Sequence, residues 1–345
     1  MPAIEEPEEA ARAAGLRYVQ TDEPGIARLR CGRGFTYRTP SGDTLRAARR
    51  REQIGSLAIP PAWTDVWICR DANGHVQATG RDAQGRKQYR YHDRWEEVRS
   101  ADKFEQLPVF GAELASIRQQ VARDLHRRGL PRERVVALVV RLLDDTLVRV
   151  GNPEYARHES FGLTTLEGRH LAGDGDGLVF EFDGKSGVEQ AVAVVDPALA
   201  KAVRACDELG GRRLFTYRED DAVREVCSDD VNDYLRDVAG PAVSARDFRT
   251  WGGTVAVVED LGPIDPAGLA DGAVDRRFLE AVDLAAERLG NTRSVCRASY
   301  VHPAVEEGFA SGALREAWRR SRRTTRLTRA EATTLRLLGD EGPTR

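Results

Sequence analysis

The hydrophobic pattern of this sequence changes near residue 92, and this change limits the folds that it can adopt. Before that point the chain has six short apolar runs, which are LRYV, IARLRC, FTYR, DVWIC, HVQATG and KQYRY. Turn signals such as D-E-P-G, P-S-G, N-G and Q-G separate them. Such runs are typical of antiparallel strands. After it, Leu, Ile and Val recur at helical spacing over 111–128 and 131–148. The pattern predicts an α+β protein of two domains.

The predicted N-terminal domain, 26–92, is a small antiparallel sheet with one helix near 43–56. The larger domain, 93–345, is mainly helical, with a small antiparallel sheet from LTTL, LVFEF and VAVV between residues 163 and 195. Its further helices are expected at 196–208, 228–239 with Ser228 as N-cap, 244–258, 273–289 and an arginine-rich end. Residues 1–25 are acidic, and we expect them to form a disordered tail.

Size and cysteine usage indicate the broad class of protein. A chain of 345 residues is too long for one ordinary core. It has no run of 18 apolar residues and no basic, apolar leader. We therefore expect no membrane span and no secretion. The five cysteines form no C-x-x-C pair. Reduced thiols in the cytoplasm are therefore expected.

The net charge of -3 at first argues against a nucleic-acid partner, but the charge is distributed in blocks. Residues 28–51 contain eight arginines against Asp43 alone, and residues 315–336 are again rich in arginine. Acidic residues gather at 1–27 and 259–287. Because a polyanion responds to the local potential, the sum does not exclude one as a partner.

Motifs for metals and nucleotides fail on inspection. Asp183-Gly184-Lys185-Ser186 resembles the end of a P-loop, but Val179 stands where that motif needs glycine. The run at 173–177 lacks the spaced carboxylates of a calcium loop, and a tight turn explains it better. The six histidines show no ligand spacing. We therefore predict no metal, no ATP site and no cofactor.

Residues 77–95 combine basic and aromatic side chains. Arg81, Arg86, Lys87 and Arg90 interleave with Tyr89 and Tyr91, and on a strand both tyrosines face the same side. They could lie against a nucleic-acid backbone. A hairpin with one solvated basic face is an equally good interpretation of this segment by itself.

Further along the chain a set of residues becomes informative only through its order. Arg149 follows a helix, Lys185 lies in a β-turn, Arg246-x-x-Arg249 lies on a helix, and Asn291 precedes Tyr300 by nine residues. Taken singly, each is best explained as an ordinary surface or capping residue. Their order resembles the active site of type IB DNA topoisomerases, a set that tyrosine recombinases share.

The resemblance to bacterial and poxvirus type IB topoisomerases runs from about residue 30 to about 310. It rests on G-R-D-A-Q-G-R-K-Q-Y-R-Y at 80–91, F-G-L-T-T-L-E-G-R-H-L at 161–171, F-D-G-K at 182–185, R-D-F-R-T-W-G at 246–252 and G-N-T-R-S-V-C-R-A-S-Y at 290–300. It implies catalytic roles for Arg149, Lys185, Arg249, Asn291 and Tyr300, and DNA contacts for Arg81, Arg86, Lys87, Gln88, Tyr89, Tyr91, Tyr155 and Arg246. The poxvirus members have His at the position of Asn291, and an amide can donate a hydrogen bond but cannot exchange protons near neutral pH.

The resemblance implies that two domains enclose double-stranded DNA and that Tyr300 forms a transient 3′-phosphotyrosyl bond, so that strand rotation and religation relax supercoils without ATP or metal. Two arginines would stabilise the charged phosphate, and Lys185 would protonate the leaving oxygen, which arginine cannot do. We expect a cytoplasmic, nucleoid-associated monomer.

Two alternative functions stay open. A tyrosine recombinase usually has His at the first position of the motif that begins with Arg246, and its N-terminal domain is helical. A non-catalytic DNA-binding protein would use the basic blocks alone.

Overall fold

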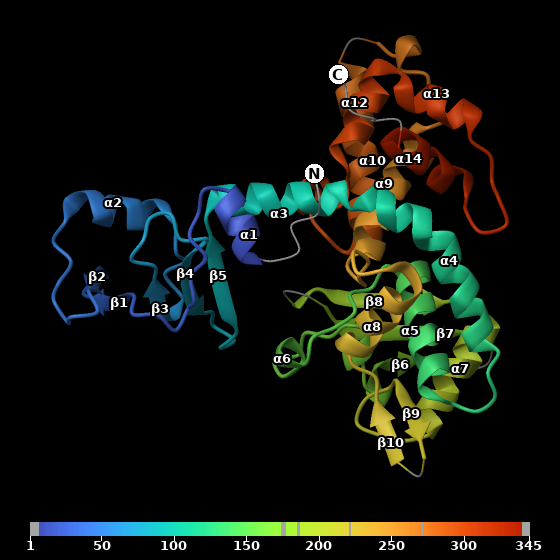
Figure 1. The fold of residues 1–345 in the computed structure, drawn as a ribbon, viewed down its shortest axis with the longest axis horizontal. Helices are drawn as coiled ribbons and strands as arrows, with labels where there is room; N and C mark the ends of the chain where they lie inside the picture. The colour runs from blue at the N-terminus through green and yellow to red at the C-terminus, as the bar shows by residue number, and fades with distance from the viewer. Residues whose placement is uncertain (1–6, 174–176, 185–186, 221, 271, 340–345) are drawn as a thin grey trace. The chain divides into compact units, whose positions relative to one another are not determined.

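The computed structural model describes residues 7–173, 177–184, 187–220, 222–270 and 272–339, with the backbone alone at 99–102. The chain divides into two compact units, Met1–Glu105 and Gln106–Arg345. The first contains an antiparallel sheet and the second is mainly helical with small sheets, so the predicted α+β class is confirmed (Figure 1). The unit boundary follows helix α3 (Asp93–Glu105), which the sequence had assigned to the larger domain.

The sheet of the first unit has the strand order β2-β1-β3-β4-β5 and is antiparallel throughout. Its strands are β1 (Ile26–Cys31), β2 (Gly34–Arg38), β3 (Thr64–Ile68), β4 (Val76–Arg81) and β5 (Lys87–Tyr91). Ile26, Val66, Ile68 and Ala78 pack against Ile54 of helix α2 (Ala48–Ser56). The helix begins later than the expected residue 43, because the Leu45 N–H donates to the Tyr37 carbonyl and keeps this stretch extended beside β2.

The acidic N-terminal segment differs from the expected disordered tail, although residues 1–6 lie outside the described part. Helix α1 (Pro7–Ala13) buries Ala10 and Ala11 against Trp95 of α3. The following LRYV run is not a strand, since only Arg17 forms an isolated bridge, with Gly74. The small side chains of Ala10 and Ala11 let α1 pack closely on α3, although Glu8 and Glu9 on the same helix are charged. This packing explains why the segment is helical and not a disordered tail.

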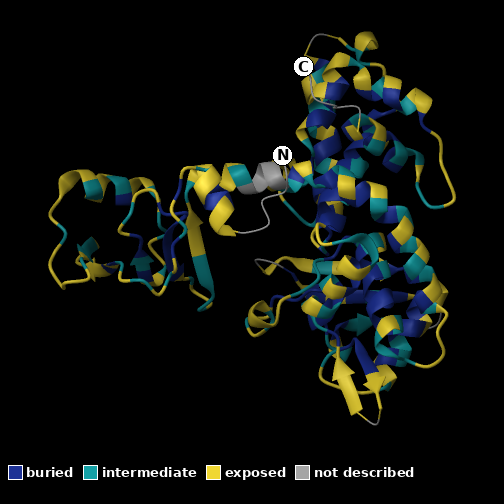
Figure 2. Ribbon diagram, in the orientation of Figure 1, coloured by how far each residue is buried: buried dark blue, intermediate teal, exposed yellow. Residues whose placement is uncertain are grey.

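The second unit is built on long helices. Helices α4 (Leu107–Leu125) and α5 (Arg132–Thr146) pack together, and α9 (Asp247–Leu261) packs against both of them and against α10 (Ala273–Leu289). Figure 2 shows their facing sides as buried. The described residues of this unit also form helices α6 (Pro153–Ala156), α7 (Pro197–Glu208), α8 (Ser228–Ala239), α11 (Arg293–Tyr300), α12 (Pro303–Ser311), α13 (Ala313–Arg320) and α14 (Arg329–Gly339), and 3-10 turns at Leu163–Thr165, Gly168–His170 and Pro266–Gly268.

In the described part of this unit the strands form two small antiparallel sheets. One has the order β6-β7-β8, with β6 (Leu171–Ala172), β7 (Leu178–Asp183) and β8 (Glu189–Val194), and the other pairs β9 (Thr216–Glu219) with β10 (Ala222–Glu225). The LTTL run is a 3-10 turn and not the expected strand, because Thr165 hydrogen-bonds back to Gly162 and closes the backbone on itself. Likewise Cys227, not Ser228, is the N-cap of α8, where the Asp230 carboxylate accepts the Cys227 N–H.

Among the described helices, none combines the length and the apolar character needed to cross a bilayer.

Candidate active site

Arg249 lies in the first turns of α9, with only 5% of its surface exposed. The Asp247 carboxylate accepts the Ser244 N–H at 2.8 Å and thus anchors the start of this helix. The Arg249 guanidinium donates to the carbonyl oxygens of Leu147 and, at 2.8 Å, of Leu289. These carbonyls lie at the C-terminal ends of α5 and α10, where helices leave acceptors unpaired. Arg249 therefore joins three helix ends at one point.

Arg149 follows the end of α5, where Leu147 turns the chain with a left-handed φ of 57°. The Leu163 N–H donates to the Arg149 carbonyl at 2.9 Å. A Cβ at Gly162 would lie 2.5 Å from that carbonyl oxygen, so only glycine permits this approach. The Arg149 side chain is half-buried and donates through Nη2 to Asn291 Oδ1 at 3.2 Å. Two residues 142 positions apart are thus brought together.

Asn291 follows Gly290, whose left-handed φ of 60° ends α10. Its backbone N–H donates to the Ala286 carbonyl at 2.9 Å. Because the amide oxygen accepts from Arg149, the amide nitrogen faces the other way. Nδ2 is buried and has no hydrogen-bond partner in the described structure. A buried unpaired donor is costly, so this nitrogen is a candidate to donate to a ligand.

Tyr300 is the last residue of α11 and is half-buried. The Thr254 hydroxyl donates to its carbonyl oxygen at 3.1 Å. A Cβ at Gly253 would lie 2.7 Å from that oxygen and 3.0 Å from the Tyr300 Cβ, so α9 can approach α11 this closely only with glycine at 253. The guanidinium carbon of Arg249 lies 5.1 Å from the centre of the Tyr300 ring. The tyrosine is thereby fixed beside a buried cation.

The two arginines change the acidity of the phenol. Burial by itself raises the pKa of Tyr300, but the charges of Arg249 and Arg149 and their hydrogen bonds outweigh burial, so its pKa lies below the ordinary value. Burial, and next the charge of Arg149, lower the pKa of Arg249 to about 10. Arg249 therefore stays charged at neutral pH. The site combines a phenol of increased acidity with fixed positive charge.

Lys185 lies outside the described residues, and so does Ser186. The residues on either side of them are placed: the Gly184 N–H donates to the Val188 carbonyl at 2.8 Å, and the Ser160 hydroxyl donates to the Gly184 carbonyl at 3.1 Å. The second of these bonds attaches Gly184, which directly follows β7, to the segment after α6. The role expected for Lys185 stays a prediction.

Tyr155 and Arg246 are both exposed. Tyr155 lies on α6, the short helix that Asn152 caps by accepting the Glu154 N–H, and 43% of its surface is accessible. Arg246 is the residue before α9, three positions from the buried Arg249. Both remain predicted DNA contacts.

In the first unit the predicted DNA-contacting residues gather on the β4–β5 hairpin. Asp82 accepts from Arg86 Nε and from Gln88 Nε2, each at 2.8 Å. Arg81 donates to the Gly85 carbonyl at 2.8 Å. The rings of Tyr89 and Tyr91 are stacked, 5.8 Å apart and 8° from parallel, which confirms that they face the same side of the strand. Both are more than one-third exposed.

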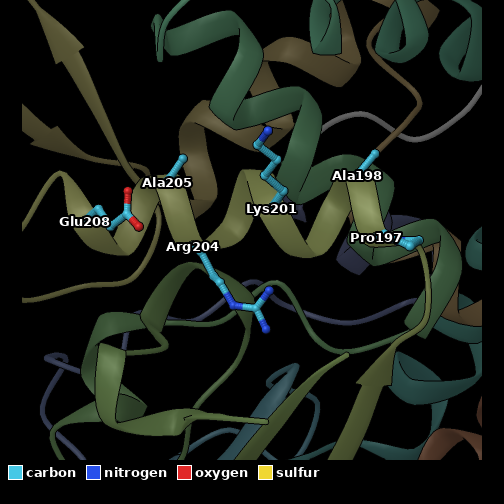
Figure 3. A pocket seen from close by; sticks show the side chains of 6 residues that line it. All are labelled: Pro197, Ala198, Lys201, Arg204, Ala205 and Glu208. Atoms are coloured by element: carbon cyan, nitrogen blue, oxygen red, sulfur yellow. The ribbon is translucent and has the colours of Figure 1, made fainter. Parts of the chain in front are cut away.

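A pocket of about 520 Å³ lies elsewhere, along the outer side of α7 (Figure 3). Its lining comes from a single helix and contains none of the residues discussed above: Pro197, Ala198, Lys201, Arg204, Ala205 and Glu208. The Arg204 guanidinium donates to the Gly177 carbonyl at 2.7 Å. Within the described residues, no group of three or more His, Cys, Asp or Glu side chains is arranged to bind a metal ion.

Comparisons with known proteins assign the chain to a class. Residues 92–315 match the family described as eukaryotic DNA topoisomerase I, catalytic core, and residues 34–82 match the bacterial DNA topoisomerase IB, N-terminal domain. The chain therefore belongs to the type IB DNA topoisomerases, isomerases that act on DNA. A DNA topoisomerase 1B from Acanthamoeba polyphaga mimivirus is 29% identical over 287 residues, which are 80% of this chain and 85% of the viral protein. This assignment favours neither the recombinase nor the non-catalytic alternative.

The residues that hold Arg249 and Tyr300 in position were not predicted from the sequence. Leu147, Leu289 and Thr254 contribute backbone carbonyls or a buried hydroxyl, and no motif marks such contacts. Gly252 is the last residue of the R-D-F-R-T-W-G motif and Gly253 follows it, so the glycine pair could have been noticed. A paired glycine inside a helix is unfavourable by itself and therefore signals a close approach.

Proposed function

We propose that Tyr300 is the nucleophile of a type IB topoisomerase reaction in this chain. Its Oη would attack a phosphodiester phosphorus, form a 3′-phosphotyrosyl bond and break the bond to the 5′ oxygen, which leaves as a hydroxyl. The observation that carries this proposal is the position of Tyr300 beside Arg249, with its pKa lowered by Arg249 and Arg149. A tyrosine with an ordinary pKa of about 10 is a weak nucleophile at neutral pH and needs such an environment.

The two arginines and Asn291 are proposed to bind the non-bridging phosphate oxygens. Arg249 has a buried Nε without a partner in the described structure, and Asn291 has its buried Nδ2. Donors fixed in place before the reaction stabilise the charge of the transition state at little reorganisation cost. Arg149 would both donate to phosphate and orient the Asn291 amide.

Religation would reverse the first step, because one phosphodiester replaces another of similar energy and no external energy source is needed. Between the two steps the free 5′ end rotates and supercoils relax. We propose that the substrate is double-stranded DNA, bound by both units, and that the protein acts as a monomer associated with the nucleoid in the cytoplasm. In the first unit the contacts would come from the β4–β5 hairpin, and in the second from Tyr155 and Arg246.

Plasmid relaxation tests this proposal. Negatively supercoiled plasmid incubated with the protein in EDTA without ATP should yield relaxed topoisomers. Tyr300→Phe should abolish relaxation and retain DNA binding, since only the nucleophilic oxygen is removed. Tyr37→Phe, which alters a half-buried tyrosine of the first unit, is the matched control and should relax plasmid normally. Full relaxation by Tyr300→Phe would show that another residue is the nucleophile.

Lys185 is proposed as the general acid that protonates the departing 5′ oxygen. Lys185→Ala should slow cleavage of an ordinary substrate, and a substrate with a 5′-bridging sulfur should restore the rate because a thiolate leaves without a proton. Lys201→Ala, on the exposed side of α7, serves as control. If the sulfur substrate gives no recovery, Lys185 has another role.

The Asn291 amide is proposed to act as a hydrogen-bond donor. Asn291→Asp keeps the shape but replaces the donor by an acceptor that would repel phosphate, so single-turnover cleavage should fall by about 100-fold or more. Asn291→His restores a donor and should retain more activity than Asn291→Asp. Equal rates for the two variants would contradict a donor role.

A further inference from the structure

Residues 16–23, which precede the sheet of the first unit, are hydrogen-bonded to it. The Arg17 N–H donates to the Asn73 carbonyl at 2.8 Å, and the Arg17 carbonyl accepts the His75 N–H at 2.9 Å. Farther along, Trp67 Nε1 donates to the Glu23 carbonyl at 2.8 Å. Residues 16–23 are therefore fixed to the sheet at both ends. They lie before residue 34, where the match to the bacterial N-terminal domain begins.

The middle of this segment supports the exposed tyrosines through His75. The Tyr18 ring stacks on His75 at 4.3 Å and 11°, and the Val19 N–H donates to His75 Nδ1 at 3.0 Å. The other neighbours of the His75 ring include Trp95 at 4.7 Å and Tyr91 at 6.4 Å. Because Tyr91 in turn stacks on Tyr89, Tyr18 is connected through packed rings to the proposed DNA-contacting surface.

Thr21 contacts that surface directly. Lys87 Nζ donates to Thr21 Oγ1 at 3.0 Å and lies 5.4 Å from the centre of the Tyr89 ring. A lysine side chain is flexible, and binding phosphate through a free ammonium would cost much of its rotamer entropy. A neutral hydroxyl acceptor can restrict the ammonium without neutralising its charge, and it leaves two of the three N–H groups for phosphate.

We propose that residues 16–21 are part of the DNA-binding surface and that Thr21 is a positioning residue, which orients Lys87 for a phosphate of the duplex. This inference rests on the proposed DNA contact of the β4–β5 hairpin. Asp82 orders Arg86 and Gln88 on the same hairpin, so Thr21 does for Lys87 what Asp82 does for its two neighbours. The expected gain is preorganisation, because Lys87 loses less freedom when DNA binds.

The main alternative to this proposal is that the segment weakens DNA binding. The segment also carries Asp22 and Glu23, and a chain that competed with DNA for Lys87 would weaken binding. Glu23, however, already has other partners, since its carboxylate accepts from Arg17 Nη2 at 3.1 Å and from the Gln20 N–H at 2.9 Å. The two possibilities predict opposite changes in DNA affinity when the Thr21 hydroxyl is removed: weaker binding if Thr21 positions Lys87, and tighter binding if the segment competes with DNA.

A double-mutant cycle on the full chain distinguishes them. In a Tyr300→Phe background, which prevents cleavage, the dissociation constant for a fluorescent duplex is measured for Thr21→Val, Lys87→Ala and the double variant over a salt series. Thr21→Val should weaken binding about three- to tenfold, as expected for loss of one hydrogen bond that orders a contact. Lys87→Ala should weaken binding and make the negative slope of log K against log salt shallower by about 1. The double variant should bind no more weakly than Lys87→Ala alone.

The control variants fix the meaning of each result. Thr21→Ser keeps the hydroxyl and should bind like the parent, and Thr44→Val changes an exposed threonine outside this contact. Unchanged or tighter binding by Thr21→Val, or additive losses in the double variant, would overturn the positioning role while leaving Lys87 as a contact. If Lys87→Ala itself binds like the parent, the proposed DNA contact fails, and the inference fails with it.

Discussion

At the scale of single residues, the site depends on a buried arginine whose own position is fixed by backbone carbonyls. The order of Arg149, Arg249, Asn291 and Tyr300 allowed the sequence to predict which residues gather, and the structure brings these four together. It could not predict the bond between Arg149 and Asn291, because a contact across 142 positions depends on how three helix ends meet. Lys185 keeps its predicted role without a structural test.

The acidity of Tyr300 gives a prediction at this scale. A lowered pKa means that the phenolate, the reactive form, becomes populated at lower pH, so the cleavage rate should rise with pH and level off below the pH typical of a free tyrosine. Arg149→Ala removes one of the charges that lower the pKa, and the midpoint should move to higher pH. Single-turnover cleavage of a 5′-bridging sulfur substrate isolates this ionisation, because its leaving group needs no acid. A midpoint that Arg149→Ala leaves unchanged would contradict the electrostatic coupling.

At the scale of elements, the C-terminal helix α14 lies beyond the matched catalytic core and yet packs on α4 and α9. Arg118 of α4 donates to Asp144 of α5 at 2.7 Å and to Glu331 of α14 at 2.7 Å. Asp144 lies three residues before Leu147, whose carbonyl accepts from Arg249. This ion-pair network therefore connects the C-terminal helix to the base of the active site.

Glu331 provides the test of this network. Burial raises the pKa of Glu331, but the ion pair with Arg118 and the hydrogen bonds from Thr328 together outweigh burial, and the net pKa lies below the ordinary value. A carboxyl group with a lowered folded-state pKa stabilises the fold above its unfolded pKa, and that stabilisation is lost as the pH falls through the folded pKa. Glu331→Gln should therefore lower the free energy of unfolding at pH 7 by about 1–3 kcal/mol, and by less in acid, as measured by urea unfolding. A loss of stability that is the same at both pH values would contradict the ion pair.

The elements also show which parts of the fold the sequence could predict. The long amphipathic helix α10 was predicted with its bounds, because its apolar period is sustained over several turns, whereas α4, α5 and α9 were predicted with bounds shifted by one to four residues. The LTTL run was predicted wrongly, because Thr165 hydrogen-bonds back to Gly162 and closes a 3-10 turn. Residues 43–47 were predicted wrongly, because the bond from the Leu45 N–H to the Tyr37 carbonyl overrides local propensity. The acidic N-terminal segment was predicted wrongly for a related reason, since its stability comes from packing on Trp95.

At the scale of the whole molecule, a net charge of -3 conceals the surface that matters for DNA. Many acidic residues are already paired with arginines, as in the pairs Arg277–Asp260 and Arg293–Asp283. On the β4–β5 hairpin of the first unit Arg81 and Arg86 pair with Asp65 and Asp82. Among the described residues, Lys87 and Arg90 of this hairpin and the exposed Arg246 of the second unit form no ion pair and present positive charge. Local potential, not the sum, should therefore govern association with DNA.

Salt dependence measures this property. For the Tyr300→Phe protein, log K for a duplex should fall linearly with log salt, because phosphate contacts release counterions. Arg246→Ala should reduce that slope by about 1, whereas Arg224→Ala, on the β9–β10 hairpin and paired with Glu219, should leave it unchanged. Affinity that is independent of salt would contradict a DNA surface built on phosphate contacts.

Covalent capture tests the central claim most directly. A duplex whose scissile strand carries only a short 3′ segment loses that segment after cleavage, so the protein remains attached to the DNA. Proteolysis and mass spectrometry then identify the modified residue. We predict a single adduct, on Tyr300 and through a 3′ phosphate. An adduct on another residue, or attachment through a 5′ phosphate, would contradict the account.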